Sequence, residues 1–247
     1  MTQRTALITG GMGGLGTVLC QHLHSLGYQV ATTYVHDSGR EKRWQSEQEK
    51  LGYAGMREYP CDVTDLQACR QLFERTSADL GTVDCLVNMA GITRDSQFVK
   101  MEEKDWLDVI GTNLIGVFNV TRQYVAPMIE NGFGRIVNIS SVNAAKGQFG
   151  QTNYSAAKSG MHGFTKSLAL EVARKGVTVN TVSPGYVETE MVLKIDEKIR
   201  DKIRNSIPVQ RFGDPLEIAR AVAFLLDDKA GYITGSELAV NGGLHMQ

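Results

Sequence analysis

Short apolar runs alternate with segments of helical periodicity from one end of the chain to the other. The first run is Thr5–Ile8, and apolar residues then recur every three or four positions as far as Leu26, where Gly27 is suited to end a helix. Such alternation predicts a parallel sheet with helices on both faces, in which ligands bind at the carboxyl ends of the strands. The sequence shows no linker and no repeat, so we expect a single α/β domain over residues 1–247.

The expected elements follow from this alternation. Further strands are expected at residues 29–33, 56–61, 83–88, 135–140, 177–182 and 238–240, which makes a sheet of about seven strands, with helices expected at residues 40–51, 105–129 and 154–174. Thr64, with Gln67 three positions later, is typical of a capping box, and Asp214 followed by Pro215 and Glu217 is typical of a helix start.

The segment of residues 187–211 is charged, is interrupted by Pro208 and follows the end of a strand. Because ligands bind at strand ends in such sheets, we expect this segment to be a mobile lid over the site. The alternative is an ordinary pair of surface helices.

Charge and composition narrow the classes of partner. The formal net charge is −1 and lysine and arginine are spread along the chain, so we expect no nucleic-acid partner. No apolar run is long enough to span a bilayer and the N-terminus lacks a signal-peptide pattern, so we expect a cytoplasmic protein with no membrane partner. The cysteines form no Cys-x-x-Cys motif and the histidines show no metal-ligand spacing, so we expect no metal site.

A glycine-rich turn follows the first strand and opens the first helix, with the spacing Gly10-x-x-x-Gly14-x-Gly16. Glycines let the backbone approach a pyrophosphate at the positive end of a helix. The strand–turn–helix context therefore predicts a dinucleotide site formed by Gly10, Met12, Gly14, Leu15 and Gly16, and the expected sheet is a Rossmann-type doubly wound sheet.

The end of the second strand bears on which nicotinamide coenzyme fits. An NAD enzyme places a carboxylate there for the ribose 2′-hydroxyl, but this chain has Tyr34. Arg40 follows within a few residues and suits a 2′-phosphate, which predicts NADP(H) as the cofactor. Asp37 would overturn this prediction if it reached the ribose, and Arg40 could equally begin a solvated helix.

Two further strand ends offer cofactor contacts. Asp62 and Val63 follow the third strand, and Asp62 could hydrogen-bond adenine. Asn88, Ala90 and Gly91 follow the fourth, where small residues would let the backbone approach the cofactor ribose. Both segments could equally be plain turn chemistry.

Tyr154 and Lys158 lie four residues apart in one expected helix, and Ser141 lies at the end of the preceding strand. Residues at i and i+4 share a helix face, so the ammonium can lie beside the phenol. A cation about 4 Å away, at an effective dielectric of about 20, is worth about 4 kcal/mol, or roughly three pKa units before desolvation opposes it. We therefore expect Lys158 to bring the pKa of Tyr154 into the range useful for proton transfer to a carbonyl oxygen. Taken alone, the pair equally fits an exposed helix face.

The chain resembles the short-chain dehydrogenase/reductase family over essentially its whole length, and the motifs occur in this order: Thr9-Gly10-x-x-x-Gly14-x-Gly16, Asn88-x-Ala90-Gly91, Asn113, Ser141, Tyr154-x-x-x-Lys158 and Pro184-Gly185. Met89 stands where the family usually has a second asparagine, so one amide is missing from this turn.

The resemblance implies a mechanism and a role for each residue. It implies that Tyr154 protonates a substrate carbonyl as hydride arrives from NADPH, while Ser141 holds that carbonyl. It implies that Lys158 lowers the pKa of Tyr154 and binds the nicotinamide ribose, and that Asn113 supports a water that relays protons to Lys158. Tyr154 and Lys158 thus also count as cofactor-binding residues. The resemblance implies three more cofactor-binding residues, Pro184, Gly185 and Thr189, and it implies that Thr189 binds the nicotinamide carboxamide or the pyrophosphate.

Within the family, residues 91–95, 146–154, 184–186 and 241–246 resemble the acetoacetyl-CoA reductases of polyhydroxybutyrate synthesis, with the β-ketoacyl-(acyl-carrier-protein) reductases as near relatives. This resemblance implies an acyl-CoA substrate and a homotetramer built on the two long helices. The substrate-binding residues that it implies, besides Ser141 and Tyr154, are Gln148, Phe149, Gln151 and Tyr186, with Asp95 and Lys100 near the mouth of the pocket.

Three alternatives stay open. The loop residues of the acyl pocket could serve only loop packing. The substrate could be carried by acyl-carrier protein rather than by CoA. The chain could also be a non-catalytic NADP-binding sensor, but a sensor would need a broken catalytic set, and Asn113, Ser141, Tyr154 and Lys158 are all present.

Overall fold

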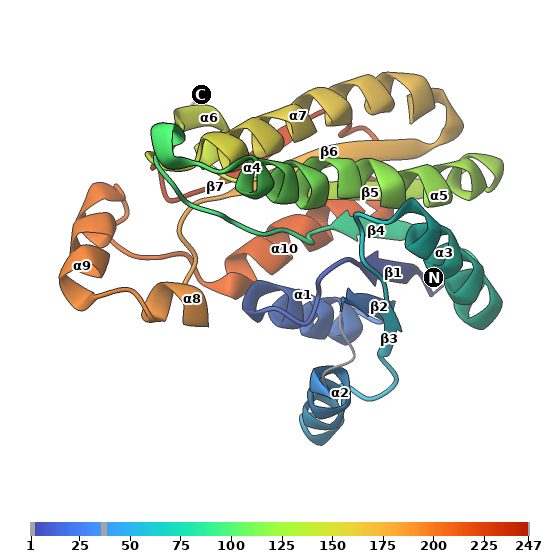
Figure 1. Cartoon of the computed structure of the whole chain (residues 1–247). Coiled ribbons are helices and arrows are strands. Elements are labelled where there is room, and N and C mark those ends of the chain that lie inside the picture. The colour runs from blue at the N-terminus through green and yellow to red at the C-terminus, as the bar shows by residue number, and fades with distance from the viewer. Residues whose placement is uncertain (1–2, 36–38, 247) are drawn as a thin grey trace.

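The computed structural model describes residues 3–35 and 39–246, and in this part of the chain seven strands form one parallel sheet (Figure 1). The strand order β3-β2-β1-β4-β5-β6-β7 confirms the expected doubly wound α/β fold. The strands are β1 (Thr5–Ile8), β2 (Gln29–Tyr34), β3 (Arg57–Pro60), β4 (Cys85–Asn88), β5 (Gly134–Ile139), β6 (Val177–Pro184) and β7 (Glu237–Val240). The α-helices are α1 (Gly14–Ser25), α2 (Arg40–Lys50), α3 (Leu66–Leu80), α4 (Glu103–Ile110), α5 (Gly116–Glu130), α6 (Asn143–Lys146), α7 (Thr152–Val172), α8 (Glu190–Leu193), α9 (Glu197–Ser206) and α10 (Pro215–Leu226).

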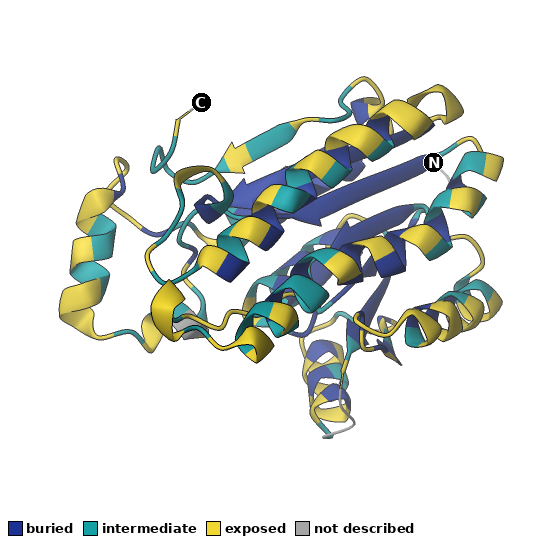
Figure 2. Ribbon diagram, turned by 45° about the horizontal axis from the view of Figure 1, so that its top comes forward, coloured by how far each residue is buried: buried dark blue, intermediate teal, exposed yellow. Residues whose placement is uncertain are grey.

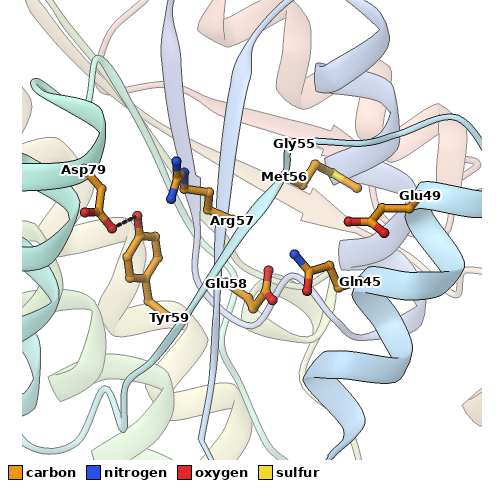
Figure 3. A pocket seen from close by; sticks show the side chains of 8 residues that line it. All are labelled: Gln45, Glu49, Gly55, Met56, Arg57, Glu58, Tyr59 and Asp79. Atoms are coloured by element: carbon orange, nitrogen blue, oxygen red, sulfur yellow. Dashed lines mark hydrogen bonds between the residues drawn. The ribbon is translucent and has the colours of Figure 1, made fainter.

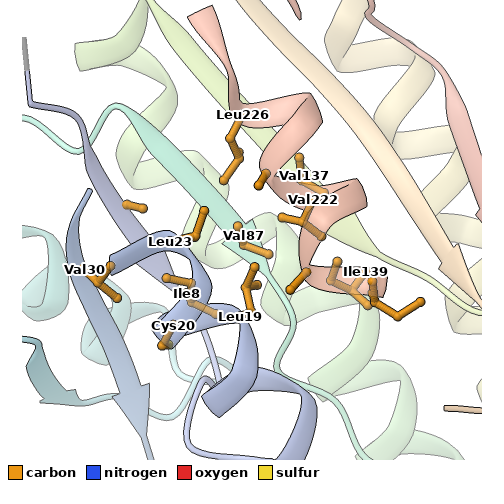
Figure 4. Close-up of a cluster of buried hydrophobic side chains, with 14 of the residues drawn as sticks. Ile8, Leu19, Cys20, Leu23, Val30, Val87, Val137, Ile139, Val222 and Leu226 are labelled. Carbon is orange, nitrogen blue, oxygen red and sulfur yellow. The ribbon is translucent and has the colours of Figure 1, made fainter. Parts of the chain in front are cut away.

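Successive side chains of the central strands point to opposite faces of the sheet and enter two separate cores. In β1, Ala6 and Ile8 belong to the core beneath α1 and α10, whereas Leu7 belongs to the core beneath α3, α5 and α7. Figure 4 shows the first core, and Figure 2 shows that the central strands are buried while the outer faces of the helices are exposed. The short apolar runs are therefore strands covered by helices on both sides.

The ligand crevice is placed by the position of β1 in the sheet. β1 pairs with β2 on one side and with β4 on the other, so Ala6 lies opposite both Val30 and Cys85. The strand order reverses at this point, and in open α/β sheets the crevice at such a reversal lies outside the carboxyl ends of the strands. The glycine-rich turn after β1 and residues 88–91 at the end of β4 both lie there.

The helix expected at residues 105–129 is confirmed as one continuous helical stretch, but a π-helical turn that was not predicted lies inside it. The chain becomes helical at Glu103 in α4, passes through a π-helical turn, η2 (Gly111–Ile115), and continues as α5 to Glu130. A Cβ at Gly116 would come within 2.7 Å of Val63 Cγ2, so the missing side chain lets this turn approach the end of β3. Periodicity does not reveal the turn, because a π-bulge adds only one residue to the hydrogen-bonded ring.

One of the two expected caps is wrong. The helix α3 begins one residue later than expected and is capped by Asp65, whose carboxylate accepts the Gln67 N–H at 2.8 Å. The Thr64 hydroxyl donates to Asp62 Oδ1 at 2.7 Å instead. The capping box at the start of α10 is confirmed. The Asp214 carboxylate accepts the Leu216 N–H, and the Glu217 carboxylate accepts the Asp214 N–H, each at 2.8 Å.

Residues 187–211 contain two helices, α8 and α9, beside the sheet (Figure 1). Val187 bridges Gly213 at one end, and the Val209 N–H donates to the Gly242 carbonyl at 3.2 Å near the other. No residue of α9 is buried. An exposed span between two anchored ends is what a lid requires, and its movement stays a prediction.

Candidate active site

The glycine-rich turn lies at the carboxyl end of β1, directly against the end of β4. Gly10 has a φ of +70°, and a Cβ at this position would lie 3.0 Å from the Ala90 Cα. The Thr9 hydroxyl accepts the N–H groups of Met89 and Ala90, at 3.0 and 3.1 Å. Position 10 therefore requires glycine, and Thr9 fastens the two strand ends together where the crevice opens.

The N-terminus of α1 suits an anion. The helix begins at Gly14 and has no acidic residue in its first turn. A Cβ at Gly16 would come within 2.6 Å of the Gly11 Cα, so the helix packs closely on the turn that precedes it. A Cβ at Gly14 would lie 3.6 Å from the Thr189 Cβ, which places Thr189 over the same turn. These glycines form a cradle that side chains would fill, and the cradle fits the pyrophosphate of a dinucleotide.

A hollow of about 240 Å³ adjoins the turn at the end of β2. Arg40 is exposed here, and its Nη2 donates to the Met12 carbonyl at 3.0 Å. The guanidinium thus lies where the adenosine ribose is expected. Leu15, the other residue predicted here, packs against the first core. Asp37, the residue that could overturn the NADP(H) prediction, lies outside the described residues. The lining of the hollow is Gly10, Met12, Thr33, Tyr34, Val35, Arg40 and Glu41.

Asp62 and Val63 take part in turn chemistry. Asp62 Oδ1 accepts the N–H and the hydroxyl of Thr64, at 2.9 and 2.7 Å, and the Val63 carbonyl accepts Asn119 Nδ2 at 2.9 Å. Asp62 is exposed, and its second oxygen makes no hydrogen bond within the described residues. The contact between Asp62 and adenine stays a prediction.

Asn88 does not present its side chain to the crevice. Its Nδ2 donates to Thr121 Oγ1 at 2.9 Å and to Asn138 Oδ1 at 2.8 Å, and the residue is buried. Only the backbone of Asn88 is left to approach a cofactor. The adjoining Ala90 is partly exposed and Gly91 is exposed, and their contact with a cofactor stays a prediction.

Ser141, Tyr154 and Lys158 come together at the carboxyl end of β5. The side chains of Ser141 and Tyr154 are hydrogen-bonded to each other. Lys158 Nζ donates to the Ile139 carbonyl at 2.7 Å and lies 5.6 Å from the centroid of the Tyr154 ring. Lys158 is only 3% exposed, so the alternative of an exposed helix face is wrong.

The expected lowering of the Tyr154 pKa is not found in this structure. Burial raises the pKa of Tyr154, the hydrogen bond from Ser141 acts to lower it, and the carboxylate of Asp95 raises it further. The physical reason lies in Lys158, which turns its ammonium to the Ile139 carbonyl and whose own pKa burial lowers to about 8. A phenol with a raised pKa is fully protonated at neutral pH, which suits a proton donor.

Asn113 lies in the π-helical turn η2 and is completely buried. Its Oδ1 accepts the Ile92 N–H at 2.8 Å, and its Nδ2 donates to the Ile92 carbonyl at 2.9 Å. A Cβ at Gly91 would lie 3.1 Å from Asn113 Oδ1 and 3.6 Å from Lys158 Nζ. The amide therefore holds the crevice backbone beside the lysine, so any water relay would have to use another group of Asn113, such as its backbone.

Replacing Asn113 by Ala is expected to lower the free energy of unfolding by about 1–3 kcal/mol, because it leaves the N–H and the carbonyl of Ile92 without partners. Urea unfolding would measure this loss. The catalytic rate should fall as well, since the segment beside Lys158 is released. An unchanged urea midpoint would show that Ile92 is not held in this way.

Part of the predicted acyl pocket comes together around Asp95. Gln151 Nε2 donates to Asp95 Oδ2 at 2.8 Å, and Asn143 Nδ2 donates to Gln151 Oε1 at 2.9 Å. Burial raises the pKa of Tyr186, and Asp95 raises it further, so this phenol also faces the carboxylate. Asp95, Gln151, Tyr154 and Tyr186 thus share one region.

The side chains of three other predicted pocket residues make no hydrogen bond to this group within the described part of the chain. Gln148 Oε1 accepts Lys146 Nζ at 2.9 Å, and the Phe149 side chain is 81% exposed. Lys100 ends the 3-10 turn η1 (Phe98–Lys100), and among the described residues no hydrogen bond or ion pair joins its side chain to the site. Their contact with a substrate stays a prediction.

Pro184 and Gly185 form the end of β6 beside the catalytic residues. The Pro184 carbonyl accepts the Val142 N–H at 2.8 Å, and the Gly185 N–H donates to the Val240 carbonyl at 2.9 Å. A Cβ at Gly185 would come within 2.9 Å of the Asn241 Cα. Glycine at 185 therefore lets the ends of β6 and β7 meet closely.

Two residues of the site were not found from the sequence. Asn153 Nδ2 donates to the Arg94 carbonyl at 3.0 Å and so fixes the loop that carries Asp95. His162 Nε2 lies 2.8 Å from Ser140 Oγ. The spacing could have indicated His162, because it follows Lys158 by four residues on the same helix face.

A larger hollow, of about 290 Å³, lies along the outer edge of β3 and contains none of the predicted site residues (Figure 3). Its polar lining includes the hydrogen bond between Tyr59 and Asp79, at 3.0 Å. The smaller hollow adjoins the glycine-rich turn at the adenosine end of the crevice. The catalytic residues meet at the carboxyl end of β5, outside both hollows. Among the described residues, no cluster of His, Cys, Asp or Glu could hold a metal ion, and no helix is long and apolar enough to cross a membrane.

Comparison with known proteins gives relatives that cover the whole chain. Residues 10–245 match the family model described as enoyl-(acyl carrier protein) reductase. The chain is 51% identical to acetoacetyl-CoA reductase of Cupriavidus necator and 52% identical to nodulation protein G of Azospirillum brasilense, with 100% of each chain covered. It is 42% identical to a 3-oxoacyl-(acyl-carrier-protein) reductase of Haemophilus influenzae, again over 100% of both chains.

The sheet order, the glycine cradle and the meeting of Ser141, Tyr154 and Lys158 agree with these matches. The chain belongs to the short-chain dehydrogenase/reductase family, a family of nicotinamide-dependent oxidoreductases.

Proposed function

We propose that this protein reduces acetoacetyl-CoA to (R)-3-hydroxybutyryl-CoA with NADPH and so supplies polyhydroxybutyrate synthesis. The observation that carries the proposal is the hydrogen-bonded pair of Ser141 and Tyr154 beside buried Lys158, at the mouth of the dinucleotide crevice. Relatives that are 45–52% identical and named acetoacetyl-CoA reductase support the choice of substrate.

The chain's own residues provide the acid and orient the ketone. NADPH, when bound, supplies the hydride. Tyr154 donates its hydroxyl proton to the ketone oxygen as negative charge develops there, and Ser141 donates a hydrogen bond to the same oxygen. Lys158 holds a positive charge next to the phenol that has lost its proton. Burial raises the pKa of Tyr154 and the carboxylate of Asp95 raises it further, so the phenol holds its proton before the reaction.

A carrier-protein-linked 3-oxoacyl reductase is the second candidate, because the Haemophilus influenzae relative carries that name. NADPH oxidation should be measured with acetoacetyl-CoA and with acetoacetyl-carrier protein at equal concentrations. We expect the higher kcat/KM with acetoacetyl-CoA. A strong preference for the carrier protein would reverse the order of the two functions, and no turnover of either thioester would remove both.

The proposed choice of NADPH rests on Arg40. Replacing Arg40 by Gln is expected to weaken NADPH binding by about tenfold or more, because a bidentate cation for the 2′-phosphate is lost. NADH binding should change little. Titration of coenzyme fluorescence measures both dissociation constants, and an equal loss for NADPH and NADH would remove Arg40 from the phosphate site.

Three further features complete the proposal. Residues 187–211 close over the bound substrate, and the protein works in the cytoplasm. It assembles as a homotetramer, for which exposed apolar side chains on the helices α4, α5 and α7 give support; these are Leu107, Phe118 and Leu170. Light scattering that finds only monomer would contradict the assembly.

A further inference from the structure

A chain of polar side chains runs beneath the catalytic residues, from β7 through α7 to the end of β5. His162 Nδ1 lies 3.3 Å from Glu237 Oε2, and its Nε2 lies 2.8 Å from Ser140 Oγ. The Ser140 hydroxyl in turn lies 3.1 Å from the Lys158 carbonyl. All four residues are buried or nearly so, since the side chains of His162 and Glu237 are 17% and 14% exposed.

This chain of contacts ends on the two residues that precede Ser141. The Lys158 side chain bonds the Ile139 carbonyl at 2.7 Å, and the Lys158 carbonyl faces the Ser140 hydroxyl. We call these two contacts the Lys158 clasp. The clasp joins the end of β5 to α7 at one point. Because Ser141 directly follows Ser140, and Tyr154 lies one helical turn before Lys158, the clasp determines where their two hydroxyls meet.

We propose that His162, oriented by Glu237, is a positioning residue that holds the Ser140 hydroxyl at the end of β5 and thereby aligns Ser141 with Tyr154. The inference rests on the proposed ketone reduction. His162 does not touch the reacting atoms; it acts through Ser140. The coenzyme crevice at β1 and β4 is made of other residues, so His162 should affect the catalytic rate and leave coenzyme binding nearly unchanged.

The proton count adds a pH dependence. Ser140 has one hydroxyl proton, which can go to the Lys158 carbonyl or to His162 Nε2. If it goes to Lys158, Nε2 must carry a proton, and Nδ1 must carry one as well to face the Glu237 carboxylate. Only the imidazolium meets all three contacts. The neutral ring keeps its proton on Nδ1 beside Glu237 and accepts the Ser140 hydroxyl on Nε2. The ring itself then holds Ser140, and the Ser140 half of the clasp forms only when the imidazolium leaves the hydroxyl proton to the Lys158 carbonyl.

The groups around the His162 ring determine the pH at which the ring takes up its second proton. Burial lowers the pKa of His162, Glu237 on β7 acts in the opposite direction, and Lys166 and Lys158 on α7 lower the pKa further. The neighbouring hydroxyls are those of Ser140 and of Ser183, at 3.5 Å. The ring is therefore neutral at pH 7, and the clasp becomes complete on the acid side of the ordinary histidine range.

The test compares two substitutions of His162 in the whole protein. His162→Leu removes both ring contacts, whereas His162→Gln keeps an uncharged donor that can reach Ser140. We expect His162→Leu to lower kcat with acetoacetyl-CoA by about 10- to 100-fold, as a loss of alignment does, with the dissociation constant for NADPH nearly unchanged. We expect His162→Gln to recover most of the rate and to lose the change in rate on the acid side of pH 6.5.

Ser140→Ala tests whether His162 acts through the Ser140 hydroxyl. Because His162 acts through Ser140, the double variant Ser140→Ala/His162→Leu should be no slower than the slower of the two single variants. Independent, multiplicative losses would contradict the chain of contacts. His24→Leu is the matched control, since His24 is a partly exposed residue of α1 whose ring contacts the Ala54 carbonyl, far along the chain from the site, and it should keep the wild-type rate and pH profile.

The wild-type rate tests the proposed function, and the ratios between variants test His162, so the two failures are distinguishable. A wild-type kcat and pH profile in His162→Leu would overturn the inference. If the variants do not fold, an NMR titration of the His162 ring in the wild-type protein decides instead. A neutral ring with its proton on Nδ1 supports the inference, and a neutral ring with its proton on Nε2 overturns it.

Discussion

Tyr154→Phe is expected to lower the turnover of acetoacetyl-CoA by about 10²- to 10⁴-fold, which is the usual worth of a positioned general acid. The substitution removes one hydroxyl and keeps the ring. Burial and Asp95 both raise the pKa of Tyr154, so the wild-type phenol holds its proton at neutral pH and can give it to the ketone oxygen. Phenylalanine has no proton to give, and it also removes the hydrogen bond to Ser141.

Binding of NADPH should survive this change, because the glycine cradle follows β1 and Arg40 is the first residue of α2, and both contact regions are separate from the Tyr154 hydroxyl. Stopped-flow measurement of hydride transfer, with a separate titration of NADPH binding, distinguishes the two effects. Tyr232→Phe is the matched control, since Tyr232 is fully exposed and should have no effect on either measurement. A rate within a few-fold of wild type in Tyr154→Phe would remove Tyr154 as the acid.

Lys158→Met is expected to impair both the chemistry and the binding of coenzyme. Methionine keeps an unbranched chain of similar length but removes the donor to the Ile139 carbonyl and the charge beside Tyr154. We expect kcat to fall by about 100-fold or more, since electrostatic stabilisation of the developing charge is lost. We also expect the dissociation constant for NADPH to rise. Lys175→Met, at an exposed lysine just beyond α7, is the control.

Stability should depend on pH through the same lysine. Burial lowers the pKa of Lys158 to about 8, below its ordinary value of 10.5. Between about pH 8 and pH 10.5 the unfolded chain therefore binds more protons at this residue than the folded protein does. Folding becomes more favourable as the pH rises through this window, by at most about 1.4 kcal/mol per pH unit. Urea unfolding of wild-type protein and of Lys158→Met should differ in this slope, and equal slopes would contradict the burial of a titrating amine.

The architecture could be predicted because it rests on periodicity. Apolar runs such as Thr5–Ile8 are strands buried on both faces, and the helix that begins at Asp214 starts where its capping residues indicate. Which of two neighbouring polar residues caps a helix could not be predicted. Thr64 has the right chemistry for a cap, but so does Asp65, and the helix begins directly after Asp65, which caps α3 while the Thr64 hydroxyl donates to Asp62. The π-helical turn that contains Asn113 leaves no mark in the pattern of apolar residues.

The candidate site was predicted where it depends on spacing along one element. Tyr154 and Lys158 share a helix face, and the structure places them together. The direction of the Tyr154 pKa was predicted wrongly, because it depends on burial and on Asp95, which lies on a different loop. The sequence also gives no sign that Asn88 turns inward to Thr121 and Asn138, since those partners come from α5 and β5.

The most direct test of the account is a crystal structure of the protein with NADP⁺ and acetoacetyl-CoA. We expect the 3-keto oxygen of the substrate to lie roughly 3 Å from both the Tyr154 and the Ser141 hydroxyl oxygens, on the side of the ring that faces the bound nicotinamide. A ketone held by other donors, with the Tyr154 hydroxyl directed elsewhere, would contradict the account.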